Sequence, residues 1–142
     1  MKKSRLFIDT NIVLDLLGER KPFYEQAAQI ATLADKGEIE LIVSALSFAT
    51  VNYVLTKYEN AASSKNKLRQ FKIISRICGL SEQIINKGLN SKFPDFEDAL
   101  QYFSAVESKC NVLITRNGKD FKLSQIPVLT PEEFLKSYFE KH

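Results

Sequence analysis

The sequence predicts a single α/β domain built on a parallel β-sheet that helices cover on both faces. Short apolar runs alternate along the chain with longer segments in which apolar residues recur at helical spacing. Strands that are separated by helices pair in parallel and are buried on both sides. Residues 1–142 contain no linker, repeat or low-complexity stretch, so we expect one domain.

Three clear strands and one short strand are expected. Each is an apolar run followed directly by polar residues, and the runs cover 6–8, 39–43, 111–115 and 127–129. Helices are expected at about 12–17, 22–36, 44–58, 65–77, 81–88, 95–109 and from Thr130 onward. Residues 59–64 are polar and small, and we expect a loop there.

Several residues mark the ends of these helices. Pro22 suits a first helical turn because no backbone donor is needed there, and Gly37 is typical of a helix end. Ser44 is suited to capping the helix after the second strand. Thr130 can cap the last helix while Glu133 reaches back to it in a capping box.

Composition excludes several classes of protein and site. With 44% apolar and 26% charged residues, the chain has the balance of a soluble globular domain, and no run approaches the ~20 apolar residues of a membrane span. We therefore expect a cytoplasmic protein with no membrane partner. His142 is the only histidine, and Cys78 and Cys110 stand far apart, which excludes His-based catalysis and zinc sites.

Polar residues gather where the predicted strands end. In a parallel sheet, ligands bind beyond the carboxyl ends of the strands. Three polar groups follow strands and a fourth opens a helix: Asp9 to Asn11, Ser44 to Thr50, Thr115 to Asp120, and Asp95 to Asp98. Asp95 and Asp98 are three residues apart and so share a helix face.

Each acid also has a simple structural explanation. Asp9 can cap the helix that follows it, and acids in a first turn complement the helix dipole. Several carboxylates at one sheet edge, however, repel one another unless a cation or shared protons compensate. Oxygen ligands without histidine or thiolate suit Mg²⁺ or Mn²⁺, and such ions can polarise a phosphodiester and activate water.

Basic residues concentrate in the middle of the chain. Between Lys57 and Lys92 there are eight basic residues and two acidic ones, a local net charge of +6. The segment is either a solvated helix face or a rim that attracts phosphates. With Arg116, which follows the third clear strand, the candidate RNA contacts are Lys65, Lys67, Arg69 and Lys72.

Two segments carry recognisable motifs: residues 7–15 read FIDTNIVLD and residues 112–121 read VLITRNGKDF. They look like the opening and closing signatures of the PIN domain family, which the chain resembles over nearly its whole length. The tail 127–135 (PVLTPEEFL) is similar to one that is common in these proteins, and Asp95 to Asp98 fall where the family carries its third acid. The motifs are moderate signals singly and a strong one in combination.

The resemblance implies a PIN-like domain with three layers, α/β/α, around a parallel sheet of about five strands. It also implies a ribonuclease that uses Mg²⁺ or Mn²⁺ to hydrolyse RNA. Many small bacterial members are VapC-like toxins of toxin–antitoxin pairs, which implies an antitoxin protein as partner and a homodimer.

Carried onto this chain, the family's first acid is Asp9 and its third is Asp98, and both are expected to ligate metal. Further catalytic or positioning acids and polar supports are expected at Asp95, Glu97, Asp120, Asn11 and Thr115. The family's second acid is replaced here by Thr50, and its fourth by Asn117, with Asp120 three residues later. Two of four expected carboxylates are therefore neutral, which lowers the negative charge that holds a divalent ion.

Three alternatives follow from the same residues. A phosphatase of the haloacid dehalogenase type also begins with a strand-end Asp, but it needs a second Asp where this chain has Asn11. A PIN-fold protein that has lost acids, as at Thr50 and Asn117, would bind RNA or a partner protein without cleavage. A protein that only pairs with an antitoxin would have no RNA affinity.

Overall fold

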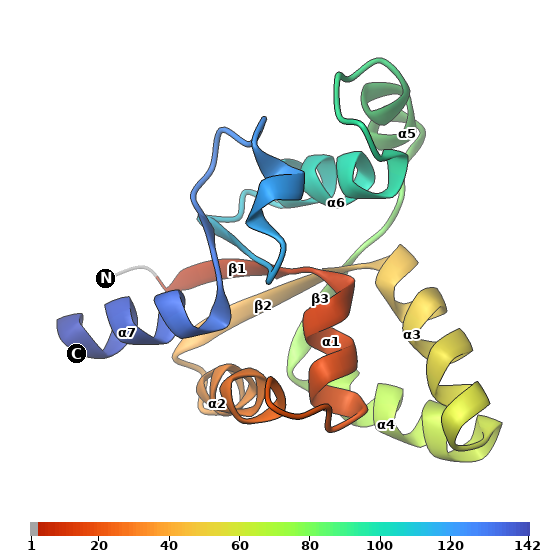
Figure 1. Cartoon of the computed structure of the whole chain (residues 1–142), viewed down its shortest axis with the longest axis vertical. Helices are drawn as coiled ribbons and strands as arrows, with labels where there is room; N and C mark the ends of the chain where they lie inside the picture. The colour runs from red at the N-terminus through yellow and green to blue at the C-terminus, as the bar shows by residue number, and fades with distance from the viewer. Residues whose placement is uncertain (1–2) are drawn as a thin grey trace.

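The computed structural model describes residues 3–142, which form a five-stranded sheet between two helical layers (Figure 1). The strands are β1 (Ser4–Ile8), β2 (Ile39–Ser44), β3 (Ser75–Cys78), β4 (Val112–Ile114) and β5 (Val128–Leu129). They all pair in parallel in the order β3-β2-β1-β4-β5, so β1 is central. The predicted three-layer α/β/α class with about five strands is confirmed.

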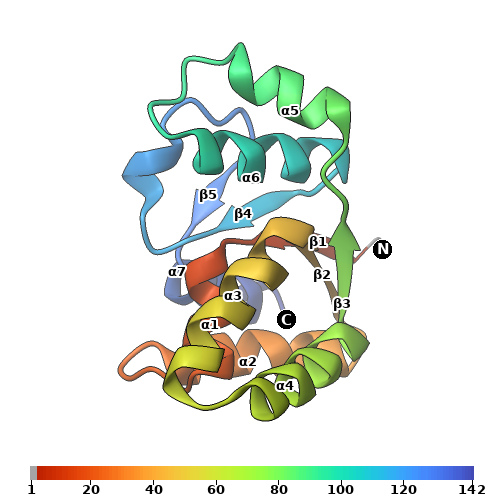
Figure 2. The same ribbon diagram turned by 90° about the vertical axis from the view of Figure 1, so that its right-hand side faces the viewer.

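Two sets of helices cover the two faces of the sheet. The helices are α1 (Thr10–Leu17), α2 (Tyr24–Asp35), α3 (Ala45–Tyr58), α4 (Ala61–Ile73), α5 (Glu82–Leu89), α6 (Phe96–Glu107) and α7 (Pro131–Lys141), with a 3₁₀ turn η1 (Gly118–Phe121). Figures 1 and 2 show α5 and α6 on one side of the sheet and α1 to α4 on the other. Helix α7 packs with α2, on that second side.

The alternation of side chains along the strands divides the core in two. Leu6 and Ile8 of β1 point into a large cluster shared with α1, α2, α3, α4 and α7, whereas Phe7 points into a smaller cluster shared with α6. Successive strand residues face opposite sides, so a buried strand serves two helical layers at once. The central strand is therefore apolar throughout its buried part.

Three sequence predictions about helix limits are wrong. The second helix begins at Tyr24, not Pro22, because residues 21–23 form a turn. The expected loop 59–64 contains the start of α4, where the Asn60 side chain caps the helix by accepting from the Ser63 N–H (2.8 Å). The expected helix 65–77 ends at Ile73, and its last residues belong to β3, a half-exposed edge strand without an apolar run.

The predicted caps are confirmed. Ser44 accepts a hydrogen bond from the Leu46 N–H (3.1 Å) at the start of α3. Thr130 and Glu133 form the reciprocal capping box of α7. Within residues 3–142, no helix is both long and apolar enough to cross a membrane.

The smaller core cluster gives a test of the fold. Phe7 is fully buried beneath α6, so Phe7→Ala is expected to lower the free energy of unfolding by roughly 3–5 kcal/mol. Phe139→Ala is the matched control, because that ring is 57% exposed, and it should change stability by less than about 0.5 kcal/mol. Urea unfolding of both variants measures this, and equal losses would contradict the arrangement of α6 over Phe7.

Candidate active site

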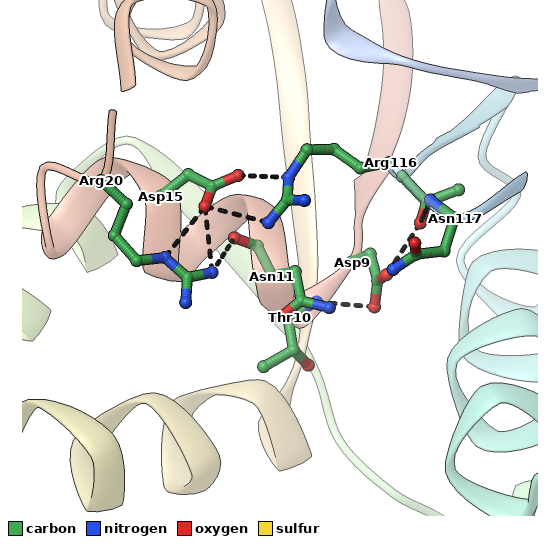
Figure 3. Close-up of polar contacts among 8 residues, drawn as sticks. Asp9, Thr10, Asn11, Asp15, Arg20, Arg116 and Asn117 are labelled. Carbon is green, nitrogen blue, oxygen red and sulfur yellow. Dashed lines mark hydrogen bonds and ion pairs between the residues drawn. The ribbon is translucent and has the colours of Figure 1, made fainter. Parts of the chain in front are cut away.

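Asp9 is buried at the carboxyl end of the central strand. It caps α1: its Oδ1 accepts a hydrogen bond from the Thr10 N–H (2.8 Å). Its Oδ2 accepts a hydrogen bond from the hydroxyl of Thr115 (2.8 Å), a residue that follows the neighbouring strand β4. Figure 3 shows the contact between Asp9 and Thr10. Burial raises the pKa of Asp9 above its ordinary value, and it outweighs the opposing effect of these two hydrogen bonds.

The acids of α6 lie close to Asp9. Asp95 caps this helix and accepts from the Asp98 N–H (3.0 Å). Burial, followed by the charges of Asp95, Asp120 and Asp9, raises the pKa of the half-buried Asp98 to about 7. Because the charges of Asp95, Asp120 and Asp9 act on Asp98, these four predicted acids lie near one another in the fold.

A cleft of about 300 Å³ opens beside these acids. Its lining combines three carboxylates, three lysines and apolar side chains: Asp95, Asp98, Asp120, Lys92, Lys119, Lys122, Phe93, Pro94 and Leu123. The lining comes from the loop before α6, from the start of α6 and from η1 with the residues after it. Two of the five predicted acids do not line this cleft: Asp9, which is buried at the end of β1, and Glu97, which is exposed on α6.

The predicted polar supports have different surroundings. Thr115 is fully buried, donates to Asp9 and accepts from the Asn117 N–H (3.0 Å). The backbone carbonyl of Asn11 accepts a hydrogen bond from Nη2 of Arg20 (3.3 Å), as Figure 3 shows. Thr50 is half-buried on α3, and its hydroxyl has no hydrogen-bond partner in the part of the chain that the structure describes.

The chemistry of the donors fits a hard cation with few protein ligands. Among residues 3–142, no group of three or more Asp, Glu, Cys or His side chains is arranged so that it could hold a metal ion, so a bound ion would take fewer protein ligands and more water. The available donors are carboxylate oxygens. Burial and, after it, the charges of neighbouring carboxylates raise the pKa of Asp98, and a cation between the acids would relieve that repulsion. Mg²⁺ commonly keeps several waters and takes one or two carboxylates, which matches an open site.

Two of the predicted RNA contacts are engaged in ion pairs. Arg116 donates to the buried Asp15 through Nε (2.8 Å) and Nη2 (3.2 Å), and its guanidinium lies 3.8 Å from the centre of the Phe23 ring. Lys67 donates to Glu59 (2.7 Å) and to the Leu17 carbonyl (2.9 Å). The other three predicted contacts, Lys65, Arg69 and Lys72, are exposed on α4.

Sequence reasoning missed two buried polar groups next to the site. Asp15 is fully buried and also pairs with Arg20 (2.9 Å), so one carboxylate serves two arginines (Figure 3). Gln101 of α6 is buried and contacts α1 and α3. In both cases the available signal was a polar residue within an otherwise apolar helical stretch, which predicts a buried partner.

Comparisons with known proteins agree with this geometry. The profile of the PIN domain family matches residues 5–119. The chain is 27% identical to Ribonuclease VapC1 of Aquifex aeolicus (strain VF5) over 143 residues, 97% of this chain and 98% of that protein.

Solved structures share the fold over most of the chain. A chain of a toxin–antitoxin complex from Klebsiella pneumoniae is 28% identical, with a TM-score of 0.66 over 90% of this chain and 98% of that one. VapBC2 from Rickettsia felis, bound to a promoter DNA fragment, has a TM-score of 0.67 at 19% identity over 88% of this chain and 96% of that one. Because the family profile covers Asp9, Asp98 and Thr115 together with most of the fold, this chain belongs to the PIN domain family.

Proposed function

We propose that this protein is a metal-dependent endoribonuclease and the toxin of a bacterial toxin–antitoxin pair. The observation that carries the proposal is that Asp98 and Asp120 line one cleft at the carboxyl edge of the sheet, the edge at which the buried Asp9 follows β1. The similarity to Ribonuclease VapC1 and to a chain of the Klebsiella pneumoniae toxin–antitoxin complex supports it. An antitoxin partner, a homodimer and a cytoplasmic location belong to the same proposal.

Asp9 and Asp98 would hold the ion, which we propose to be Mg²⁺ or Mn²⁺. Asp120 and Asp95 lie close enough to influence Asp98 and would act directly or through water, and Glu97 would act from further out. When bound, such an ion polarises the phosphodiester and lowers the pKa of a bound water. The Thr115 hydroxyl and the Thr10 N–H hold Asp9 in one orientation for this role.

The cleft lysines are the better candidates for phosphate contacts than the basic helix. Lys92, Lys119 and Lys122 are exposed. They line the same cleft as the three carboxylates of Asp95, Asp98 and Asp120. None of these three forms an ion pair within residues 3–142, so their charges are available to a phosphate backbone. The predicted contacts Lys65, Arg69 and Lys72 on α4 are the competing surface.

A second candidate is a PIN protein that binds RNA without cutting it. Thr50 and Asn117 replace two acids of the family pattern and supply only neutral oxygens. Phosphate binding does not require catalysis, so the lysines would still bind RNA.

An RNA cleavage assay separates these two candidates. With Mn²⁺ or Mg²⁺, the wild type is expected to cut single-stranded RNA, and Asp9→Asn or Asp98→Asn should lower the rate more than about 100-fold, because even outer-shell partners contribute roughly 10–100-fold. Asp35→Asn, the same change at an exposed position on α2, should leave the rate unchanged. Cleavage that survives both site substitutions would refute the assignment, and RNA binding without cleavage would favour the second candidate.

Metal-free stability should depend on pH in a predictable direction. The folded-state pKa of Asp98 is about 7 against an ordinary value of 3.8, so the folded chain holds a proton that the unfolded chain has released. The resulting stabilisation is complete below about pH 4 and is lost as the pH rises through about 7. The melting temperature should therefore fall between about pH 5 and pH 8, and Mg²⁺ or Mn²⁺ should restore it at pH 8.

The matched variants for this measurement are Asp98→Asn and Asp35→Asn. Asp98→Asn should flatten the dependence on pH, because the titrating group is gone, whereas Asp35→Asn should keep the wild-type profile. Calorimetric melting across the pH range measures both. An equally steep profile in Asp98→Asn would show that another group causes it.

The surface that contacts RNA can be identified by a charge-matched exchange. In an Asp9→Asn background, which allows binding without cleavage, alanines at Lys92, Lys119 and Lys122 should weaken binding to single-stranded RNA at least tenfold and lower the salt slope by roughly 2, at about 0.7 per phosphate contact. Alanines at Lys65, Arg69 and Lys72 remove the same charge and should have little effect. Fluorescence anisotropy at several salt concentrations measures this, and the reverse result would assign RNA binding to α4.

A further inference from the structure

Gln101 connects the two helical layers at the edge of the sheet that carries the acids. Its Nε2 donates to the Thr10 hydroxyl of α1 (2.8 Å) and to the Ser47 hydroxyl of α3 (3.1 Å). The two hydroxyls also hydrogen-bond to each other (2.6 Å). In Figures 1 and 2, α6 lies on one side of the sheet and α1 and α3 lie on the other, so the contacts pass beyond the strand ends.

Every member of this cluster is next to a site residue in the chain. Thr10 directly follows Asp9, and Gln101 comes three residues after Asp98, on the same face of α6. Ser47 comes three residues before Thr50, where the family carries its second acid. The cluster therefore joins α1, α3 and α6.

Two of the three members of this cluster are buried, and one of their polar atoms has no hydrogen-bond partner within residues 3–142. Gln101 is 3% exposed and Ser47 is fully buried. The Gln101 Oε1 accepts no hydrogen bond from residues 3–142. A buried amide with an unused acceptor is costly, and it is retained where its position serves something other than stability. An apolar residue would fill this place in α6 without that cost.

We propose that Gln101 is a positioning residue that fixes α6 against α1 and so sets the placement of Asp98 relative to Asp9. This inference rests on the proposed metal-dependent function. Asp9 follows the central strand and caps α1, whereas Asp98 belongs to α6 in the other helical layer, and α6 packs mainly on α5 and the strands. With Thr50 and Asn117 neutral, few charged ligands remain, so metal affinity depends more strongly on how well those few are held in place.

Metal affinity distinguishes a positioning role of Gln101 from a role in which its side chain only fills space in the core. Gln101→Met keeps the length of the side chain but cannot donate to Thr10 or Ser47. We expect it to weaken Mn²⁺ binding to the full chain about 10–100-fold, the range for partners that orient metal ligands. Isothermal titration calorimetry with Mn²⁺ measures the dissociation constant, and circular dichroism checks that the variant is folded.

Two further variants complete the experiment. Ser104→Ala is the matched control, since Ser104 is fully buried on the same helix three residues on, and its hydroxyl has no partner within residues 3–142. It should leave Mn²⁺ binding unchanged. Ser47→Ala removes one acceptor while leaving the Thr10 contact, and should weaken binding a few-fold with little risk to folding.

The outcomes distinguish this inference from the proposed function. If wild type binds Mn²⁺ and both Gln101→Met and Ser47→Ala bind it within about twofold of wild type, positioning by Gln101 is overturned and the metal site stands. If Gln101→Met does not fold, Thr10→Val takes its place, because it removes the hydroxyl that accepts from Gln101 and keeps the Thr10 N–H on Asp9; an unchanged Mn²⁺ affinity in that variant overturns the inference alone. If wild type binds no Mn²⁺, the metal proposal fails and this inference fails with it.

Discussion

The hydrogen bond from Thr115 to Asp9 determines how the candidate site is organised. It joins residues that follow two adjacent parallel strands, and together with the Thr10 N–H it provides donors for both oxygens of a buried carboxylate. A buried acid without such donors would be neutralised or expelled to the surface. Because Thr115 also accepts from the Asn117 N–H, the same hydroxyl fixes the start of the loop that carries Asp120.

Charge balance explains how several acids coexist at one edge of the sheet. Burial is the largest cause of the raised pKa values of Asp9 and Asp98, and the charges of neighbouring acids add to it at both residues. The three lysines of the cleft lie at its rim and attract anions without removing the repulsion among the acids. Thr50 and Asn117 stand where the family pattern has acids, so this chain has less repulsion but also less negative charge to hold a metal ion. The placement of the remaining acids therefore matters more.

Sequence patterns predicted the elements that follow local rules. The strands with apolar runs, the caps at Ser44 and Thr130 and the acids after β1 could be read from residue types and spacing. The strand β3 could not, because it is a short edge strand of mixed polarity that pairing with β2 defines. The ion pair of Arg116 and the contacts of Gln101 join residues that are far apart in the chain, and only the tertiary structure brings them together.

The buried Asp15 with its two arginines has a consequence for how this chain can diverge. Arg116 lies between Thr115 and Asn117, and its guanidinium is neutralised by an acid of α1. Replacing Asp15 alone leaves both guanidinium groups without their carboxylate, whereas replacing Arg116 alone leaves the buried Asp15 paired with Arg20. Among relatives, loss of the acid at position 15 should therefore be accompanied by loss of the base at position 116, whereas the base alone can be lost where position 20 keeps its arginine.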